Sequence, residues 1–279
     1  MKTYFAGIDV GSTMTKVVII EDGITVSVIG PTGAEHRKLA NKVMEEALIK
    51  SNISLDSIEY IISTGYGRIN VPFSDKQFTE ITCHAKGIIH LFPKAKTIID
   101  IGGQDVKGIK IDSNGKVKDF VMNDKCAAGT GRFIEVMAHT LGVNLKEVGE
   151  ISLQSRNPAK ISNICTIWAQ QEVVAGLSEG IPVADLLAGI HQSLGDRIVR
   201  LVSRLKIEDE VIVTGGGGKN KALTKAISNI IGHEIKVPPE PLITGALGAA
   251  LIGKEITEEA KKNLVTLKKK NRILEEIKV

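Results

Sequence analysis

The chain contains two related segments, in which the equivalent residues Asp9 and Asp100 lie 91 positions apart. This repeat constrains the fold more than any other feature of the sequence. The run Ile8-Asp9-Val10-Gly11 returns as Ile99-Asp100-Ile101-Gly102, and Lys16 has its counterpart in Lys107. In each copy a β-prone apolar run meets an acidic residue and glycine, and a second β-rich run follows, which predicts a hairpin with a polar tip. A period of about 90 residues is too long for a solenoid repeat. We therefore interpret the pattern as duplication of a whole α/β domain.

The length of 279 residues also favours two domains over one. We expect a first domain at residues 1–95, a second at 96–253 and a helical tail at 254–279, with the boundary between the two domains near residues 93–97. The C-terminal segment is also a candidate to pack back on the first domain. In the tail, one helical stripe is formed by Ile256, Ala260, Leu264 and Leu267.

Periodicity and breaker residues predict the remaining elements. The expected helices are 37–51, 131–141, 166–178, 184–205, 221–231 and 245–252, and strands are expected at 60–63 and 211–214. The second of these strands leads into four consecutive glycines, Gly215 to Gly218, and a helix follows directly. The second domain is thus expected to be rich in helices.

The tip of the first hairpin combines a carboxylate, a glycine, hydroxyl groups and a lysine. Backbone N–H groups and hydroxyls can cradle phosphate oxygens, Lys16 can neutralise charge, and Asp9 can hold Mg²⁺ through water. A plain hairpin turn with a surface lysine is the alternative interpretation of this loop taken alone. The candidate nucleotide-binding residues of this loop are Asp9, Gly11, Ser12, Thr13, Met14, Thr15 and Lys16.

The second hairpin and the glycine run supply two further candidate walls for a nucleotide. Two acid-glycine hairpins can grip a triphosphate from both sides, and Gln104 or Asp105 can orient the attacking water. A glycine-rich turn before a helix lets an adenosine approach the backbone closely. The spacing matches neither a P-loop nor a dinucleotide fingerprint. The candidates here are Asp100, Gly102, Gly103, Gln104, Asp105, Gly215, Gly216, Gly217, Gly218, Lys219 and Gly245, with Asp9, Gln104 and Asp105 expected to be catalytic.

Together these motifs resemble the phosphate and adenosine motifs of the superfamily that contains acetate kinase, sugar kinases, heat-shock chaperones and actin. The resemblance implies an α/β fold of two ribonuclease-H-like, actin-like ATPase domains, with ATP in a cleft between them. Domain closure would then be the mechanical output of ATP binding.

Two of the three cysteines lie immediately before predicted helices. At such a position the helix dipole and free backbone N–H groups stabilise a thiolate or an anionic cluster. Cys126 and Cys165 are half of the four thiolates that a 4Fe–4S cluster usually takes, so a cluster shared across a twofold axis would predict a homodimer. Two buried, inert thiols are the alternative. Zinc is disfavoured because the chain has no Cys-x-x-Cys pair.

At this level the chain resembles the activators of 2-hydroxyacyl-CoA dehydratases, in the BadF/BadG/BcrA/BcrD-type ATPase family, which are related to ATPase subunits of benzoyl-CoA reductases. The match covers about residues 3–253, and its most specific stretches are 7–16, 64–68, 99–107, 122–133, the Cys165 segment and 245–250. The resemblance implies one 4Fe–4S cluster per homodimer, held by Cys126 and Cys165 of each subunit.

The same resemblance implies an ATP-driven transfer of single electrons in an anaerobic setting. The acceptor would be a partner iron–sulfur enzyme, such as a 2-hydroxyacyl-CoA dehydratase, a benzoyl-CoA-reductase-like enzyme or a double-cubane cluster protein. Ferredoxin or flavodoxin would be the electron donor.

Two segments depart from the family pattern. The chain has Trp-Ala-Gln-Gln-Glu at 168–172, where Phe-Ala-Glu-Ser-Glu is expected, and Gly-Gly-Gly-Gly-Lys at 215–219 in place of a Gly-Gly-Val-Ala-Gln form. These differences bear on the choice of partner and on nucleotide affinity. We expect Trp168 to pack in the dimer interface or the core. Cys83, beside His84 and followed by His90, is expected to be a core thiol, because one cysteine and these histidines are too few ligands for a metal.

Two other functions fit part of the pattern. A small-molecule kinase of the same superfamily would use Asp105 as the base for a substrate hydroxyl, but it would leave the two helix-capping cysteines unexplained. A nucleotide-switched binding protein without redox chemistry is the other alternative.

Composition and charge narrow the remaining classes of function and the cellular location. The net charge of +4 is small, and much of the lysine excess lies in about the last thirty residues, so nucleic-acid binding is not expected. No apolar stretch approaches the length of a membrane span. With no signal sequence, the three cysteines are expected to be free thiols in a reducing, cytoplasmic compartment.

Overall fold

The computed structural model describes residues 2–112, 114–123, 126–270, 272 and 274. The described chain forms two compact units: unit 1 draws on residues 1–93, 113–117 and 242–279, and unit 2 on 94–112 and 118–241. Residues 242–253, which the sequence analysis assigned to the second domain, group with unit 1. The reason is that their helix packs against the first, second and fourth strands of that unit.

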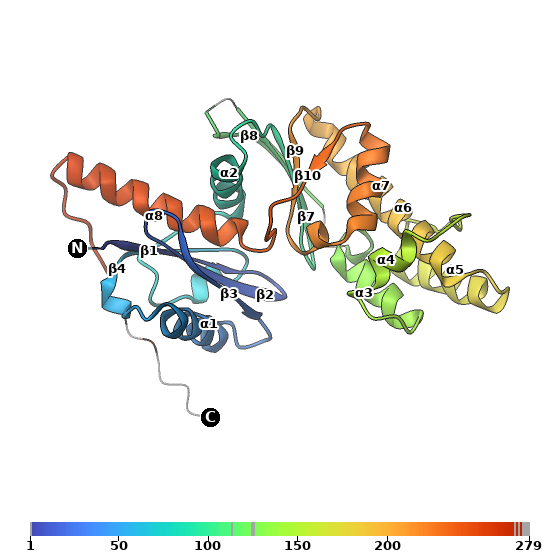
Figure 1. The fold of residues 1–279 in the computed structure, drawn as a ribbon, viewed down its shortest axis with the longest axis horizontal. Helices are drawn as coiled ribbons and strands as arrows, with labels where there is room; N and C mark the ends of the chain where they lie inside the picture. Colours follow the sequence, from blue (N-terminus) through green and yellow to red (C-terminus); the bar gives the residue numbers. More distant parts are fainter. Residues whose placement is uncertain (1, 113, 124–125, 271, 273, 275–279) are drawn as a thin grey trace. The chain divides into compact units, whose positions relative to one another are not determined.

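Unit 1 is built on a five-stranded mixed sheet with the order β3-β2-β1-β4-β5 (Figure 1). The first three strands form an antiparallel meander, and β4 and β5 add in parallel on the other side of β1. Both β1 and β2 are buried along nearly their whole length, as their β-branched runs require. The strands are β1 (Tyr4–Val10), β2 (Met14–Ile20), β3 (Ile24–Pro31), β4 (Ile58–Thr64) and β5 (Lys76–Gln77).

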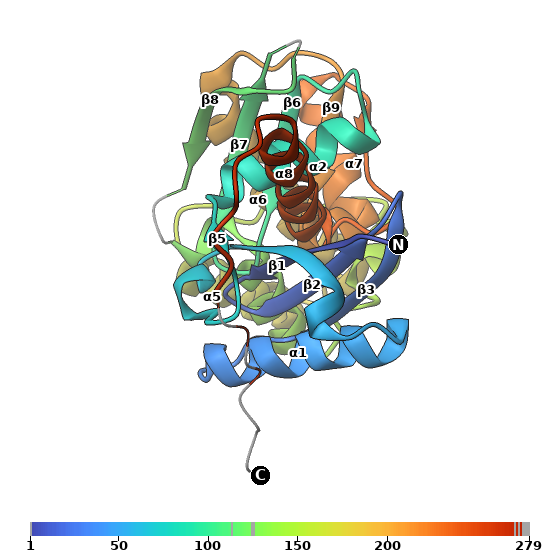
Figure 2. The same cartoon turned by 90° about the vertical axis from the view of Figure 1, so that its left-hand side faces the viewer.

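Helices cover both faces of this sheet, with α1 (His36–Ser51) on one face and α8 (Thr244–Lys262) on the other (Figures 1 and 2). Helix α2 (Glu80–Leu91) packs beside α8. The two backbones approach so closely that a Cβ atom at Gly248 would lie 1.7 Å from the Cys83 carbonyl oxygen. Glycine is therefore required at this crossing, because even the Cβ of alanine would overlap the carbonyl oxygen. Short 3₁₀ turns lie at Leu55–Ser57 and Arg68–Asn70.

Unit 2 repeats the topology of unit 1. Its sheet has the order β8-β7-β6-β9-β10, which is again third, second, first, fourth and fifth along the chain. The predicted α/β fold is thus confirmed. The strands are β6 (Thr97–Ile101), β7 (Val106–Ile111), β8 (Val117–Met122), β9 (Val211–Thr214) and β10 (Ile235–Lys236).

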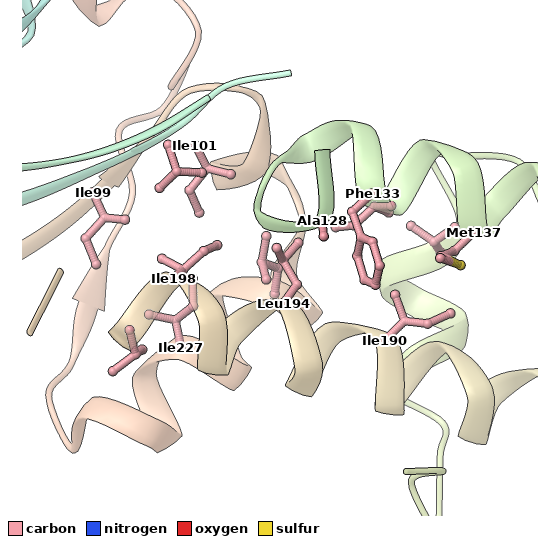
Figure 3. Close-up of a cluster of buried hydrophobic side chains, with 14 of the residues drawn as sticks. Ile99, Ile101, Ala128, Phe133, Met137, Ile190, Leu194, Ile198 and Ile227 are labelled. Carbon is pink, nitrogen blue, oxygen red and sulfur yellow. The ribbon is translucent and has the colours of Figure 1, made fainter. Parts of the chain in front are cut away.

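The helices of unit 2 enclose an apolar core. Figure 3 shows Ile99 and Ile101 of β6 facing Ile198 of the long helix α6, with Phe133 of α3 packed near Ile190. The helices are α3 (Gly131–Thr140), α4 (Val148–Ser152), α5 (Thr166–Ser178), α6 (Val183–Val202) and α7 (Lys221–Ile231), with 3₁₀ turns at Ala127–Gly129, Ser203–Leu205 and Gly216–Lys219.

The C-terminal tail was predicted to be a helix with one apolar stripe, and the structure differs from this prediction. Helix α8 is longer than the expected 245–252 helix but ends at Lys262. Leu264 follows with a positive φ of 56° and is 94% exposed, so the second half of the stripe lies outside the helix. None of the helices in the described ranges combines the length and apolar character needed to cross a membrane.

Candidate functional site

The first hairpin holds a buried ion pair at its open end. Asp9 on β1 lies opposite Lys16 on β2, and the Lys16 Nζ atom is 2.9 Å from Asp9 Oδ2. The loop is closed by the Gly11 N–H, which donates to the Met14 carbonyl at 3.1 Å. A carboxylate and a cation are thus held side by side in a mostly buried place, where their interaction is weakly screened by water.

Not every predicted residue of this loop faces a ligand. Ser12 is half-buried and Thr13 is exposed at the tip. Thr15, in contrast, is fully buried, and its hydroxyl lies 3.0 Å from the Thr32 hydroxyl. The structure therefore gives Thr15 a role in joining β2 to the end of β3, and does not bring its side chain to the loop surface.

The second hairpin repeats the buried Asp–Lys pair of the first hairpin and adds a second carboxylate. Lys107 is 2% exposed, and its Nζ atom lies 3.5 Å from Asp100 Oδ2 and 2.7 Å from Asp105 Oδ1. Asp105 is therefore held by an ion pair inside its own hairpin, while Gln104 is exposed at the tip. The Gly102 N–H donates to the Asp105 carbonyl at 2.9 Å and closes the loop.

Each of the two buried carboxylates lies against a glycine. Gly65, after β4, has a φ of +86°, and Gly215, after β9, has a φ of +77°. A Cβ atom at Gly65 would lie 2.4 Å from Asp9 Oδ1, and one at Gly215 would lie 2.6 Å from Asp100 Oδ1. Only glycine tolerates both this backbone conformation and this approach. The two glycines therefore hold equivalent places in units 1 and 2.

Gly215 was a predicted site residue, whereas Gly65 was not. The signal was present, because the pattern Thr-Gly-x-Gly occurs at 64–67 and again at 214–217. The second glycine of each pattern also matches: a Cβ atom at Gly67 would lie 2.5 Å from Val10 Cγ1, and one at Gly217 would lie 2.4 Å from Ile101 Cγ2. The repeat thus extends to the fourth strand of each unit.

The glycine run leads into helix α7, whose N-terminus is capped by a polar side chain. After the 3₁₀ turn, Asn220 accepts the Leu223 N–H at 3.1 Å through its side-chain oxygen. Its amide nitrogen lies 2.8 Å from Nε2 of His191 on α6. Burial lowers the pKa of His191 to about 4, so this ring is neutral near pH 7. Lys219, in contrast, points to Glu240, with 2.8 Å between the charged atoms.

Gly245 lies beside the first carboxylate. A Cβ atom at Gly245 would lie 3.2 Å from Asp9 Oδ2 and 3.2 Å from His84 Nε2. His84 is buried, and its Nδ1 lies 2.9 Å from the Thr244 hydroxyl. The start of α8 and helix α2 therefore meet next to Asp9. Burial raises the pKa of the neighbouring Cys83 to about 12, which agrees with the prediction of an inert core thiol.

The two remaining cysteines lie in unit 2, and only Cys165 directly precedes an α-helix as predicted, because α3 begins at Gly131, five residues after Cys126. Cys126 precedes the 3₁₀ turn 127–129, and Cys165 precedes α5. Both are free and half-buried. Trp168, on the first turn of α5, is 67% exposed, so core packing within one chain is not its role.

The segment that carries Cys126 is joined directly to the second phosphate hairpin. The first two N–H groups of α3, from Gly131 and Arg132, donate to the carbonyls of Gly102 and Gly103, both at 2.9 Å. A Cβ atom at Gly131 would lie only 3.0 Å from the Gly102 oxygen. The hairpin tip and the start of α3 therefore cannot move independently without breaking two hydrogen bonds.

Cys126 and Cys165 are donors of the kind that a thiolate-bound group requires. Among the residues that the structure describes, no three His, Cys, Asp or Glu side chains gather closely enough to hold a metal ion. Cys165, at the start of α5, lies where backbone N–H groups favour negative charge. Two thiols are half of a four-thiolate set.

Comparison with known proteins assigns the chain to a protein family. Two sheets of one topology, each with a buried Asp–Lys hairpin, define an α/β protein of the actin-like ATPase class. The chain belongs to the BadF/BadG/BcrA/BcrD ATPase family, whose family model matches residues 6–253.

Individual proteins match over nearly their whole length. The activator of lactoyl-CoA dehydratase from Anaerotignum propionicum is 43% identical over 92% of this chain and 99% of its own. The crystal structure of (R)-2-hydroxyglutaryl-CoA dehydratase component A from Acidaminococcus fermentans matches with a TM-score of 0.89 and 39% identity, covering 92% of this chain and 99% of that one.

A second solved structure shows the same fold with a nucleotide analogue. It is the activator of 2-hydroxyisocaproyl-CoA dehydratase from Clostridium difficile with bound ADPNP, which matches with a TM-score of 0.88 and 41% identity. The match covers 95% of this chain and 99% of that one. These matches confirm the predicted actin-like ATPase fold.

Proposed function

We propose that the protein is an ATP-hydrolysing activator that donates single electrons to a partner iron–sulfur enzyme. Its relatives are named activators of lactoyl-CoA and 2-hydroxyisocaproyl-CoA dehydratases, which supports a 2-hydroxyacyl-CoA dehydratase as the partner. A benzoyl-CoA-reductase-like or double-cubane cluster protein is a further candidate of the same chemistry. Ferredoxin or flavodoxin would reload the protein in an anaerobic cytoplasm.

The observation that carries this proposal is the direct link between a phosphate hairpin and a cysteine segment. ATP bound at the second hairpin would contact Gly102 and Gly103, whose carbonyls accept the first N–H groups of α3. A change in the hairpin on hydrolysis would therefore move the start of α3, and with it the 126–130 segment.

The nucleotide site is proposed from the two hairpins and the glycine run. Asp9 would hold Mg²⁺ through water, and Lys16 would neutralise phosphate charge. The ADPNP in the solved relative supports ATP as the ligand. Because Lys107 already holds Asp105, we propose that Asp105 orients the hairpin and that the exposed Gln104 is free to orient water. The nucleotide cleft between the two domains stays a prediction.

Cys126 and Cys165 are proposed to hold one 4Fe–4S cluster together with the same residues of a second copy. The cluster would supply a single electron at low potential. The chain would hold one sulfur ligand at the start of α5 and the other before the 3₁₀ turn 127–129. The homodimer would also cover the exposed Trp168, in line with the predicted interface role of this side chain.

Anaerobic purification with iron and sulfide analysis tests the proposal. We expect about four iron and four sulfide per two chains, as one shared cluster requires, together with a dimer by light scattering. A cluster-free monomer that binds ATP normally would refute the redox function while leaving the ATPase in place.

The cysteine variants separate this function from the kinase alternative. Replacing Cys126 or Cys165 by Ser should abolish iron binding but leave nucleotide binding, whereas Cys83→Ala is the matched control because Cys83 is buried away from solvent. A kinase should keep phosphate transfer in all three variants. The near full-length match to named activators also favours electron transfer over a kinase.

A further inference from the structure

One arginine contacts both cysteine-bearing segments of unit 2. Arg197 on α6 donates from Nη1 to the Asn163 carbonyl at 2.5 Å and to the Ile164 carbonyl at 3.3 Å. Its stem packs against the other segment, because a Cβ atom at Gly129 would lie 3.1 Å from Arg197 Nε and 3.3 Å from its Cδ. Cys165 follows the first segment directly, and Cys126 lies three residues before Gly129.

The carbonyl groups of the segment before Cys165 are bound by side chains of α6, while the Ser162 N–H donates to Glu172 of α5 at 2.6 Å. Residues 162–164 form neither helix nor strand. The Ser193 hydroxyl, one turn before Arg197, donates to the Ser162 carbonyl at 3.1 Å, so three consecutive carbonyls are bound by two side chains of one helix. Because α6 is the central helix of the unit 2 core, it provides a rigid support for this irregular segment.

We infer that Arg197 is a positioning residue that holds the Cys126 and Cys165 segments in one fixed arrangement, so that both thiols address the same iron–sulfur group. The inference deepens the proposed function and rests on it. A guanidinium suits this task, because the two N–H groups of Nη1 bind the two carbonyls while Nε and Cδ pack on the glycine. A lysine can donate to two carbonyls as well, but its nitrogen is one bond closer to the backbone, so it does not reach both carbonyls while its stem lies over Gly129.

The same contact places a permanent positive charge beside the proposed site of an anionic group. Arginine stays protonated at all physiological pH values. Positive charge near an iron–sulfur group raises its reduction potential, because it stabilises the reduced and more negative state. Arg197 would thus act on both the arrangement of the ligands and the potential, and Arg197→Lys separates the two effects because it keeps only the charge.

The first experiment uses metal-free protein and hydrogen exchange at segments 126–131 and 162–166. Arg197→Met keeps much of the stem but removes the donors, and Arg200→Met on the same helix is the control, because Arg200 is exposed. Loss of two net hydrogen bonds should speed exchange at 162–166 by roughly 5- to 150-fold, and loss of the guanidinium packed on Gly129 should also speed exchange at 126–131, with no change for Arg200→Met. Exchange in Arg197→Met equal to that of the unchanged protein in either segment would overturn the inference.

A second variant tests the connection from the opposite side. Gly129→Ala adds a methyl group against the Nε and Cδ atoms of Arg197, so it should loosen 162–166 by displacing the side chain that binds the Asn163 and Ile164 carbonyls. If exchange changes only around residue 129, the inference is wrong. This variant also decides the matter if Arg197→Met does not fold.

The cluster-loaded protein provides the last readout. Arg197→Met should lose iron to a chelator several-fold faster than the Arg200→Met control, and Arg197→Lys should lose iron equally fast but keep a midpoint potential nearer that of the unchanged protein. Equal iron loss in Arg197→Met and Arg200→Met would contradict the positioning role. If the unchanged protein binds no iron at all, the proposed function fails, while the exchange data still decide whether Arg197 joins the two segments.

Discussion

The side-chain amide nitrogen of Asn220 lies 2.8 Å from Nε2 of His191, inside the core of unit 2. The other ring nitrogen of His191, Nδ1, lies 2.8 Å from the Leu187 carbonyl, which can only accept, so Nδ1 carries the proton and Nε2 accepts from Asn220. The amide oxygen of Asn220 then faces the Leu223 N–H. His191 therefore fixes the orientation of the residue that caps α7, directly after the glycine run.

Replacements of His191 test whether this orientation matters for the proposed ATP site. His191→Gln keeps an acceptor near the Nε2 position, whereas His191→Asn keeps only a polar group on the Nδ1 side. We expect Gln to leave the KM for ATP nearly unchanged and Asn to raise it roughly three- to tenfold, the effect of one lost hydrogen bond, with kcat little changed. Steady-state ATPase assays give both constants. A KM that follows the melting temperature of each variant would point to a purely structural role.

The buried ring also predicts a pH dependence of stability. Burial lowers the pKa of His191 from 6.5 to about 4, so between these values the unfolded chain binds a proton that the folded protein excludes. The stabilisation is fully present above pH 6.5 and is lost as the pH falls toward 4. Relative to His191→Gln, the unchanged protein should lose up to about 3 kcal/mol of unfolding free energy over this range. Urea unfolding at several pH values measures it, and parallel curves for the two proteins would contradict the assignment.

The parts of the site that could be predicted from the sequence are those encoded locally. Each Asp–Lys pair lies within a single hairpin, so the spacing between Asp9 and Lys16 is enough to place them side by side. Gly65 and Arg197 were missed because their roles depend on contacts between distant segments. Gly65 reaches Asp9 through the pairing of β1 with β4, and Arg197 reaches two loops from a helix whose pattern indicates only a buried face.

The C-terminal segment groups with unit 1, in agreement with the predicted packing on the first domain, but its continuous helical form was predicted incorrectly for a related reason. Helical spacing of apolar residues suggested a continued helix, but the chain turns after Lys262 and returns to the β4 side of unit 1. There the buried Asp75 carboxylate accepts the Ile61 N–H at 2.8 Å and the Lys270 N–H at 3.0 Å, and it pairs with Arg272. Lys270 lies 195 positions after Asp75, so no local sequence pattern indicates that the two residues are in contact.

Removal of the Arg272 charge should therefore destabilise unit 1. The side chain of Asp75 is completely buried and that of Arg272 nearly so. Arg272→Met leaves a buried carboxylate without its cation, which costs about 3 to 5 kcal/mol. The exposed pair of Lys269 with Glu59 is the control, and Lys269→Met should cost less than about 1 kcal/mol.

Urea unfolding of these two variants measures the difference. Adding Asp75→Asn to Arg272→Met should recover part of the loss, because the neutral amide no longer leaves a charge unpaired. Equal stability of Arg272→Met and Lys269→Met would show that the tail does not contribute to unit 1 in solution.

The glycines beside the two carboxylates give a last prediction, with a built-in control. Gly65, Gly215 and Gly180 all have positive φ angles, of 86°, 77° and 77°. A Cβ atom at Gly180 would meet nothing within 4 Å, whereas at the other two it would press on the carboxylate of Asp9 or Asp100 and on the backbone of the residue that follows it. Gly180→Ala should therefore show only the backbone cost, about 1 to 2 kcal/mol.

Gly65→Ala and Gly215→Ala should show that cost and also displace a carboxylate of the proposed nucleotide site. We expect kcat/KM for ATP to fall at least about tenfold in both, since each displaced group loses more than one charge-assisted contact. Gly180→Ala should keep its ATPase activity at temperatures where it is folded. ATPase assays and melting curves on the three variants decide the matter. If all three lose stability equally and none loses activity, the buried Asp9 and Asp100 hold the fold together without contacting the nucleotide.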